Sequence, residues 1–163
     1  LETVLDDHEM IEKAQVFSSI DGLLNTRITQ KTPIVRVITD NEIYYLDAKG
    51  EKMSLSKNFS ARVPLVTGEI SVQKSKPYLF LFKEIKKDDF LSKNITGASI
   101  TASGNVVLTN RSYDYKIVFG KPINVENKLK NYKAFFQHAI KDTLIESYKE
   151  VNLMFTQQVV CKK

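Results

Sequence analysis

Apolar and polar residues alternate in short runs along most of the chain, a pattern typical of β-strands. The first stretch differs, because Leu1, Leu5, Met10, Ile11 and Ala14 form a broken apolar stripe at helical spacing. We therefore expect a helix over residues 1–14, followed by strands over 15–20 and 23–29. Asp21-Gly22 lies between these two strands, and Asp-Gly between apolar runs predicts a β-hairpin.

Further strands follow a break at Pro33. One is predicted over 34–38, and a second hairpin over 43–47 and 52–55, where Gly50 suits a positive φ in the turn. Residues 63–66 form another short apolar run. It contains Pro64, which cannot donate a backbone hydrogen bond, so the run is predicted at the edge of a sheet.

Two amphipathic helices are predicted in the second half of the chain. The first begins at Ser75-Lys76-Pro77, a favourable N-cap with Pro in the first turn. Its buried face comprises Tyr78, Leu81, Phe82 and Ile85. The second follows an N-cap at Asn124, and its apolar stripe comprises Val125, Leu129, Tyr132, Phe136 and Ile140.

Strands are predicted between and after these helices, over 95–102, 105–110, 115–119 and finally 151–160. The last segment, VNLMFTQQVV, places Val151, Leu153 and Phe155 on one side. We expect Val151 and Leu153 to close the core and the part from Phe155 onward to lie at a partly covered edge. The order of elements predicts an α+β fold, with a mostly antiparallel or mixed sheet and helices packed on one face.

The amino-acid composition indicates the class of protein and argues against binding to nucleic acid. The 163 residues are 42% hydrophobic and 26% charged, as expected of a soluble globular protein of one domain or one domain plus a fragment. The net charge of +5 comes from lysines interleaved with acids, which argues against a nucleic-acid surface. No run approaches the ~20 apolar residues of a membrane span. Because the sequence starts at Leu1 within a helical pattern, we expect a piece of a longer protein.

Residues with catalytic or metal-binding chemistry are few. His8 lies among Asp6, Asp7 and Glu9, and His138 has no Cys or His at metal-ligand spacing. Asp88-Asp89 resembles an acid/base pair, but adjacent carboxylates flanked by lysines favour surface charge. Cys161 is the single cysteine, so no intrachain disulfide is possible. Its neighbours Lys162 and Lys163 favour a lowered pKa of the thiol. We predict no enzyme, no metal, no cofactor and no small-molecule substrate.

Three stretches together resemble a known family. They are Gln30–Val37 running into Tyr44–Gly50; Arg62–Gly68; and Ile117–Lys121 with Lys128-Leu129, Phe135-Phe136 and the closing VNLMFTQQVVCKK. In order and spacing they resemble the extracytoplasmic part of the bacterial cell-division protein FtsQ (DivIB), most closely its Bacteroidetes-type branch. Proteobacterial members carry Arg-Tyr and Ser-Gly where this chain has Met154-Phe155 and Gln157-Gln158, so the resemblance transfers no arginine contact.

The resemblance implies a domain plan and a function. Residues 1–38 resemble the C-terminal part of a POTRA domain, and residues 39–163 a complete β domain. It implies a non-enzymatic scaffold that binds the bitopic partners FtsB and FtsL and helps regulate septal wall synthesis. Such a protein lies at the periplasmic face of the inner membrane, anchored by one transmembrane helix. An incomplete POTRA sheet has an open edge, through which we expect association.

The predicted partner-binding residues lie in the last segment: Met154, Phe155, Thr156, Gln157, Gln158 and Val159. They would bind by strand addition along the C-terminal edge. Two other functions stay open. One is a POTRA-type module of outer-membrane protein assembly or transport, consistent with the hairpin. The other is a cell-wall enzyme that would use Asp88 or His138.

Overall fold

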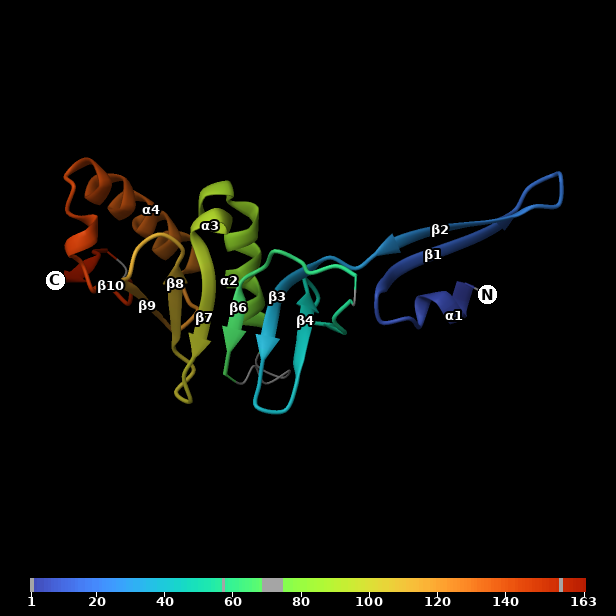
Figure 1. Ribbon diagram of the computed structural model, residues 1–163, viewed down its shortest axis with the longest axis horizontal. Coiled ribbons are helices and arrows are strands. Elements are labelled where there is room, and N and C mark those ends of the chain that lie inside the picture. The colour runs from blue at the N-terminus through green and yellow to red at the C-terminus, as the bar shows by residue number, and fades with distance from the viewer. Residues whose placement is uncertain (1, 57, 69–74, 156) are drawn as a thin grey trace.

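The structure, a computed structural model, describes residues 2–56, 58–68, 75–155 and 157–163. Within these residues, a nine-stranded sheet covered by helices forms the larger body, and a two-stranded hairpin projects from it (Figure 1). The hairpin joins the body at residues 31–32, between its second strand and the first strand of the large sheet. The fold is α+β with a mixed sheet, as predicted.

The projecting hairpin consists of α1 (Glu2–Asp6), β1 (Ile11–Ser18) and β2 (Leu24–Gln30). The predicted helix over 1–14 is therefore wrong in its second half. From Ile11 onward the backbone pairs with β2, in the register Ile11 to Gln30 and Ala14 to Ile28. Tertiary pairing outweighs a broken helical stripe here. The predicted turn at Asp21-Gly22 is confirmed.

The large sheet has the strand order β11-β10-β9-β8-β7-β6-β3-β4-β5. β6 pairs in parallel with both β3 and β7, and β10 pairs in parallel with β9, whereas the other neighbours are antiparallel. The strands are β3 (Pro33–Ile38), β4 (Ile43–Asp47), β5 (Lys52–Met53), β6 (Leu65–Thr67), β7 (Ile95–Ile100), β8 (Val106–Asn110), β9 (Lys116–Gly120), β10 (Glu150–Asn152) and β11 (Val160–Lys162).

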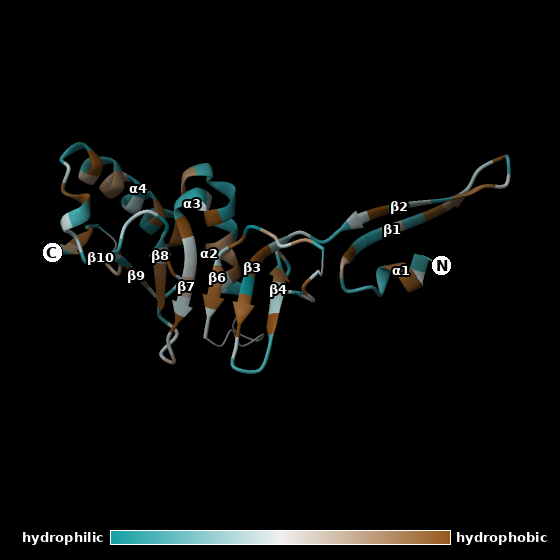
Figure 2. Ribbon diagram, in the orientation of Figure 1, coloured by the Kyte–Doolittle hydropathy of each residue, from teal (hydrophilic) through white to brown (hydrophobic). Residues whose placement is uncertain are grey.

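Helices cover one face of this sheet (Figure 1). They are α2 (Lys76–Lys87), α3 (Asp89–Asn94) and α4 (Val125–Lys141), followed by a 3₁₀ turn (Ile145–Ser147). On the covered face, six residues that are register partners on successive strands are all buried. They are Val37, Val66, Ala98, Leu108, Ile117 and Val151. The helices bury Phe82, Ile85, Leu129, Tyr132 and Phe136 against it. Figure 2 shows the same strands as predominantly hydrophobic.

β6 lies in the middle of the sheet, so its predicted edge position is wrong. Pro64 precedes the strand instead of occupying it. Its carbonyl accepts a hydrogen bond from the Arg36 N–H at 3.0 Å. Because β6 begins only at Leu65, the absence of an N–H at Pro64 interrupts no hydrogen bond of the strand. A proline beside a strand therefore does not fix the strand at an edge.

Both long helices begin where predicted, with small shifts in the buried face. In α2, Leu79 is buried, whereas the Tyr78 hydroxyl donates to the Gly104 carbonyl at 3.0 Å. In α4, Ala139 is buried and Ile140 is 44% exposed. The short helix α3, which the pattern did not predict, begins where the Asp88 side chain accepts a hydrogen bond from the Leu91 N–H at 3.0 Å.

The boundary expected at residue 38 falls after β3, and β3 pairs with β4 and β6 in the large sheet. By strand pairing, residues 33–38 thus belong with the larger body. The hairpin pairs only with itself among the described strands.

Candidate functional site: the C-terminal sheet edge

The C-terminal segment joins the sheet through β10, which lies parallel to β9. The Leu153 N–H donates to the Val118 carbonyl at 2.8 Å, and the Lys116 N–H donates to the Lys149 carbonyl at 3.0 Å. Val151 and Leu153 are almost completely buried. The prediction that these two residues close the core is confirmed.

The chain then reverses, so the predicted single strand over 151–160 is wrong. β10 ends at Asn152, whose side-chain oxygen accepts the Met154 N–H at 2.9 Å. Such an Asx contact turns the backbone away from the strand direction. β11 returns antiparallel to β10, with Val160 opposite Asn152 and Lys162 opposite Glu150. Gln157, which disturbed the alternation, lies in the connection between the two strands.

The predicted partner-binding residues lie in this connection. Met154 and Phe155 are about half exposed (51% and 49%), and Gln157 and Gln158 are exposed. These four line a surface hollow of about 550 Å³. Val159 is partly buried against the core, and Thr156 lies outside the described residues. The structure therefore brings the described members together, on a loop rather than on a strand.

Gly120 gives the connection room to pass over the end of β9. A Cβ atom at this position would lie 2.7 Å from Cγ of Met154, and the backbone has φ of +74°. Both the space and the left-handed conformation therefore favour glycine. The Met154 side chain packs onto the backbone of β9 as a result.

β11 is the terminal strand of the sheet, and none of the described strands pairs with its outer edge. An edge strand presents unpaired N–H and C=O groups that a further strand can satisfy. The register partners of Glu150 are Lys116 in β9 and Lys162 in β11, so charged residues alternate in sign across this end of the sheet. The arrangement can therefore accept an added strand.

Cys161 lies in β11 and is partly buried against the core. Burial raises the pKa of its thiol, which contradicts the lowered pKa expected from Lys162 and Lys163. The two lysines are exposed to water, where their charge is screened. The thiol is therefore neutral at neutral pH, and its side chain packs against the core.

A buried polar cluster holds the sheet beneath the edge. The Asn110 amide donates to the hydroxyls of Tyr132 at 2.8 Å and Tyr115 at 3.3 Å, and the two hydroxyls lie 2.9 Å apart. The Asn110 side-chain oxygen accepts the Ser112 and Tyr113 N–H groups. Desolvation raises the pKa of both Tyr115 and Tyr132, so both hydroxyls stay protonated. The cluster ties β8, the following loop and α4 together.

The start of α4 is fixed to β9 by a buried lysine. Lys128 Nζ donates to the carbonyls of Phe119 at 2.9 Å and Lys121 at 3.0 Å, and lies 4.7 Å from the centroid of the Phe119 ring. Burial lowers the pKa of this ammonium. The hydrophobic pattern of the helix did not predict that Lys128 is buried and binds these two carbonyls.

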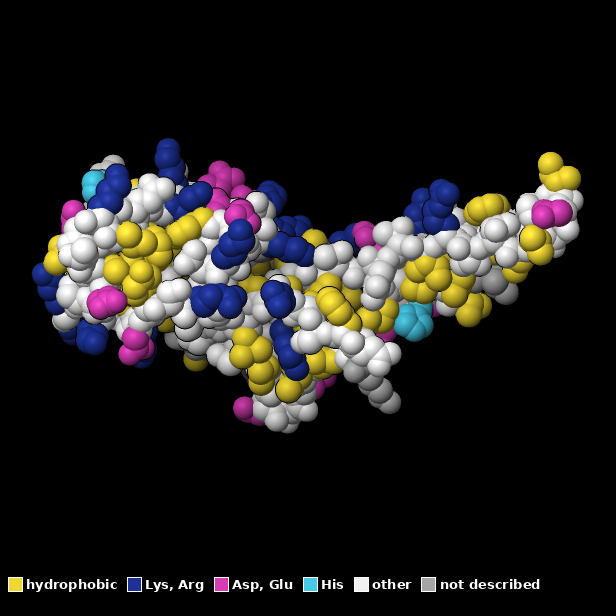
Figure 3. All heavy atoms as spheres, turned by 45° about the horizontal axis from the view of Figure 1, so that its top comes forward, with side chains coloured by type: hydrophobic (Ala, Val, Ile, Leu, Met, Phe, Trp, Pro, Cys, Tyr) yellow, Lys and Arg dark blue, Asp and Glu magenta, His cyan; other side chains and the backbone are white. Residues whose placement is uncertain are grey.

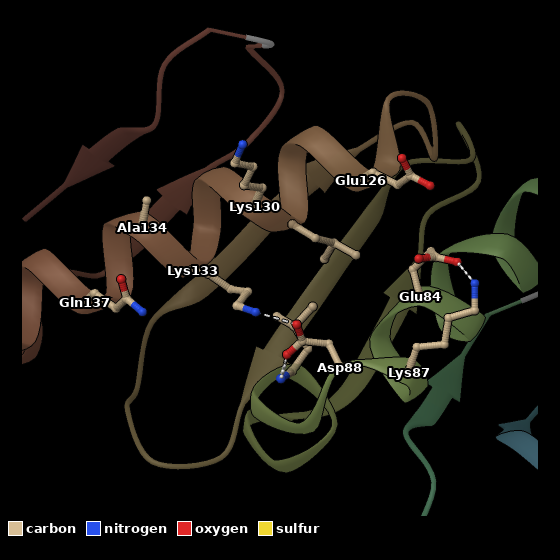
Figure 4. A pocket seen from close by; sticks show the side chains of 10 residues that line it. Glu84, Lys87, Asp88, Glu126, Lys130, Lys133, Ala134 and Gln137 are labelled. Carbon is tan, nitrogen blue, oxygen red and sulfur yellow. Dashed lines mark hydrogen bonds and ion pairs between the residues drawn. The ribbon is translucent and has the colours of Figure 1, made fainter.

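A second hollow, of about 530 Å³, lies between α4 and the α2–α3 junction (Figure 4). Asp88 pairs across it with Lys133 of α4, and Glu84 pairs with Lys87. Asp88 is thus a helix cap and an ion-pair partner, while His138 lies exposed near the end of α4. Among the described residues, no group of three or more His, Cys, Asp or Glu side chains is arranged to hold a metal ion.

The family described as "FtsQ/DivIB, C-terminal related" matches residues 32–162. The chain belongs to this family. The match spans the whole large sheet, including β11, and starts where the hairpin ends. Among curated proteins, none matches the chain.

Membership gives the chain a role in bacterial cell division. FtsQ/DivIB proteins are membrane-anchored scaffolds of the division complex with an extracytoplasmic domain, and the family suggests division-complex proteins as partners. In the part of the chain that the structure describes, no helix has the length and apolar character needed to cross a bilayer.

The two carboxylates at the start of α3 give a matched test of the structure. Asp88→Ala removes the Leu91 cap and the Lys133 pair, and should lower the free energy of unfolding by about 1 kcal/mol. Asp89→Ala removes a side chain that is 83% exposed and should change it by less than about 0.5 kcal/mol. Urea unfolding of both variants measures the difference.

The Asp88 contribution should depend on pH. Burial alone would raise the pKa of this carboxyl, but the hydrogen bonds from Lys133 and the Leu91 N–H outweigh it and lower the pKa. Its contribution is therefore complete at neutral pH and is lost as pH falls through the lowered pKa, below about 3.9. An equal effect of both substitutions at neutral pH would contradict this assignment.

Proposed function

We propose that this protein is a non-enzymatic scaffold of the bacterial division complex that binds a partner by strand addition along the outer edge of β11. The observation that carries the proposal is the reversal at Asn152, which leaves β11 as the terminal strand of the sheet within the matched family region. Main-chain hydrogen bonds would supply affinity, and flanking side chains would supply specificity.

The exposed side chains beside β11 suit this role. Met154, Phe155 and Val160 are 51%, 49% and 42% exposed, whereas Gln157 and Gln158 offer both donors and acceptors. An aromatic anchor with a neighbouring methionine is typical of a protein interface. Thr156 and Val159 complete the proposed partner-binding set with Met154, Phe155, Gln157 and Gln158.

The partners we propose are extracytoplasmic segments of FtsB and FtsL type, and the consequence is regulation of septal wall synthesis. The full-length protein would cross the inner membrane once and hold this region at its periplasmic face. The alternative of an outer-membrane assembly module is less favoured, because the family match covers the large sheet and the hairpin unit is not repeated in the described residues.

Phe155→Ala tests the side-chain anchor. Removal of a half-exposed aromatic at the centre of an interface should weaken binding of FtsB/FtsL-type segments at least about tenfold. The matched control is Phe80→Ala, where the side chain is 43% exposed. Phe80 lies on α2, which packs against β3, and five strands separate β3 from β11 in the sheet order. Isothermal titration calorimetry with purified partner segments measures both affinities.

A chain that ends at residue 157 tests the strand itself. It lacks β11 and should not bind, while circular dichroism checks that the remaining sheet is folded. Unchanged affinity of the truncated chain, or equal losses for Phe155→Ala and Phe80→Ala, would refute strand addition at this edge.

We further propose that the hairpin is the C-terminal part of a POTRA domain and that it associates with a second copy of the chain through β2. The outer edge of β1 is already occupied, since the Ala14 and Val16 N–H groups donate to Asp6 at 2.7 Å and Glu2 at 2.6 Å. All residues of β2 are exposed. Apolar side chains lie along the hairpin and its tip (Figure 3): Phe17, Ile20, Leu23, Leu24 and Ile28.

Leu24→Lys should weaken this association, because a lysine on an edge strand opposes pairing. Leu24 is 63% exposed, and Leu144→Lys, at a site 40% exposed on the larger body, serves as the control. Sedimentation equilibrium should show a concentration-dependent dimer for the unchanged chain and the control, and a shift toward monomer for Leu24→Lys. A monomer at every concentration would contradict the proposal.

A further inference from the structure

A cationic cleft lies at the end of the sheet where β6 and β7 begin. It has a volume of about 710 Å³, and the three charged side chains that line it are Arg62, Lys93 and Arg111. Val63, Pro64 and Ile95 form its apolar walls. No carboxylate lines the cleft among the described residues. In strand order, β8, β9 and β10 separate it from β11.

Arg111 is held in place by the backbone. Its Nε donates to the Lys93 carbonyl at 2.7 Å, and its N–H donates to the Asn94 carbonyl, also at 2.7 Å. This fixes one edge of the guanidinium plane at the end of α3. The Nη groups make no hydrogen bond with the described residues, so their donors remain available to a ligand.

The other cations are only partly neutralised. Arg62 is exposed and makes no hydrogen bond or ion pair with the described residues. Lys93 pairs with Asp89 at 2.7 Å, but both side chains are more than 70% exposed, so this pair contributes little and is readily exchanged.

The shape favours a peptide carboxylate over a bilayer surface. Arginine forks match carboxylates in a bidentate geometry, and here they line a hollow with apolar walls rather than a flat, lysine-rich face. Figure 3 shows this end of the sheet turned toward the viewer, with Lys and Arg side chains gathered over it. Recognition of acidic motifs by clustered arginines is a recurring mode of peptide binding.

We propose that this cleft binds an acidic segment of a protein partner, with Arg62 and Arg111 as the carboxylate-binding residues. It is a second interaction surface, distinct from the β11 edge, and it does not depend on strand addition. Its affinity should fall with increasing salt, because exposed charge pairs are screened.

A labelled hexaglutamate peptide is the probe, with fluorescence anisotropy for affinity and amide chemical shifts for location. Arg62→Gln/Arg111→Gln should weaken binding at least about tenfold. The control Arg27→Gln/Lys76→Gln loses the same two charges at exposed positions on β2 and α2 and should bind as the unchanged chain does. Amide shifts should concentrate at residues 62, 63, 92–96 and 111.

Further arms distinguish the site from its rivals. Arg111→Lys should retain the charge but lose much of the affinity for hexaglutamate. Arg62→Gln alone leaves the hydrogen bond from Arg111 to the Lys93 carbonyl intact. A loss of affinity in this variant therefore cannot come from loss of that hydrogen bond. Equal losses in the two double variants would show a general charge effect and overturn the proposal. Binding of phosphatidylglycerol vesicles or inorganic phosphate at this cleft without binding of hexaglutamate would also overturn it.

Discussion

Pairing β10 in parallel beside β9 requires the chain to leave one end of the sheet and return to the other, and α4 makes that crossing. Lys128 fixes the start of α4 to the end of β9, and Tyr132 joins its middle to Asn110 and Tyr115. Val151 and Leu153 are then buried where α4 delivers the chain. The position of β11, and therefore of the candidate edge, depends on this crossing.

The sheet has two faces with different roles. The helices cover the face that carries Val66, Leu108 and Ile117, and the alternate residues form an open face. One row on the open face runs from Ile43 across the sheet to Val160. Its two ends are similarly exposed, at 43% and 42%. The helical layer thus covers one face, and the opposite face is left open.

Alternation and helical spacing predicted the fold class because burial on one face enforces those periods. The same rules failed where a single polar contact decides the path. Asn152 turns the chain between β10 and β11, and Asp88 starts α3, yet neither changes the apolar pattern. The Ile11–Ala14 segment failed for another reason, since its strand conformation comes from pairing with residues 28–30 rather than from its own periodicity.

Four of the predicted partner-binding residues line one surface hollow, but on a loop and not on the predicted strand, and their role stays a prediction. Alternation identified Val151 and Leu153 as core and Phe155 as marginal, which their exposure confirms. The pattern of apolar and polar residues cannot show that the chain reverses after Leu153, because a short polar loop and the exposed end of a strand have the same pattern. The three cations of the cleft are also far apart in the sequence, at positions 62, 93 and 111. Parallel pairing of β6 with β7 brings the segments of Arg62 and Lys93 together, and antiparallel pairing of β7 with β8 adds Arg111.

Site-specific photo-crosslinking in dividing cells tests the central claim most directly. A benzophenone side chain would replace Val160 in β11. In a control variant it would replace Ile43 in β4, which lies at the other end of the same cross-strand row on the open face. If β11 receives a partner strand, Val160 should give a discrete crosslink to a division protein of FtsB or FtsL type, and Ile43 should give none. Crosslinks to that partner from Ile43 but not from Val160 would contradict the account.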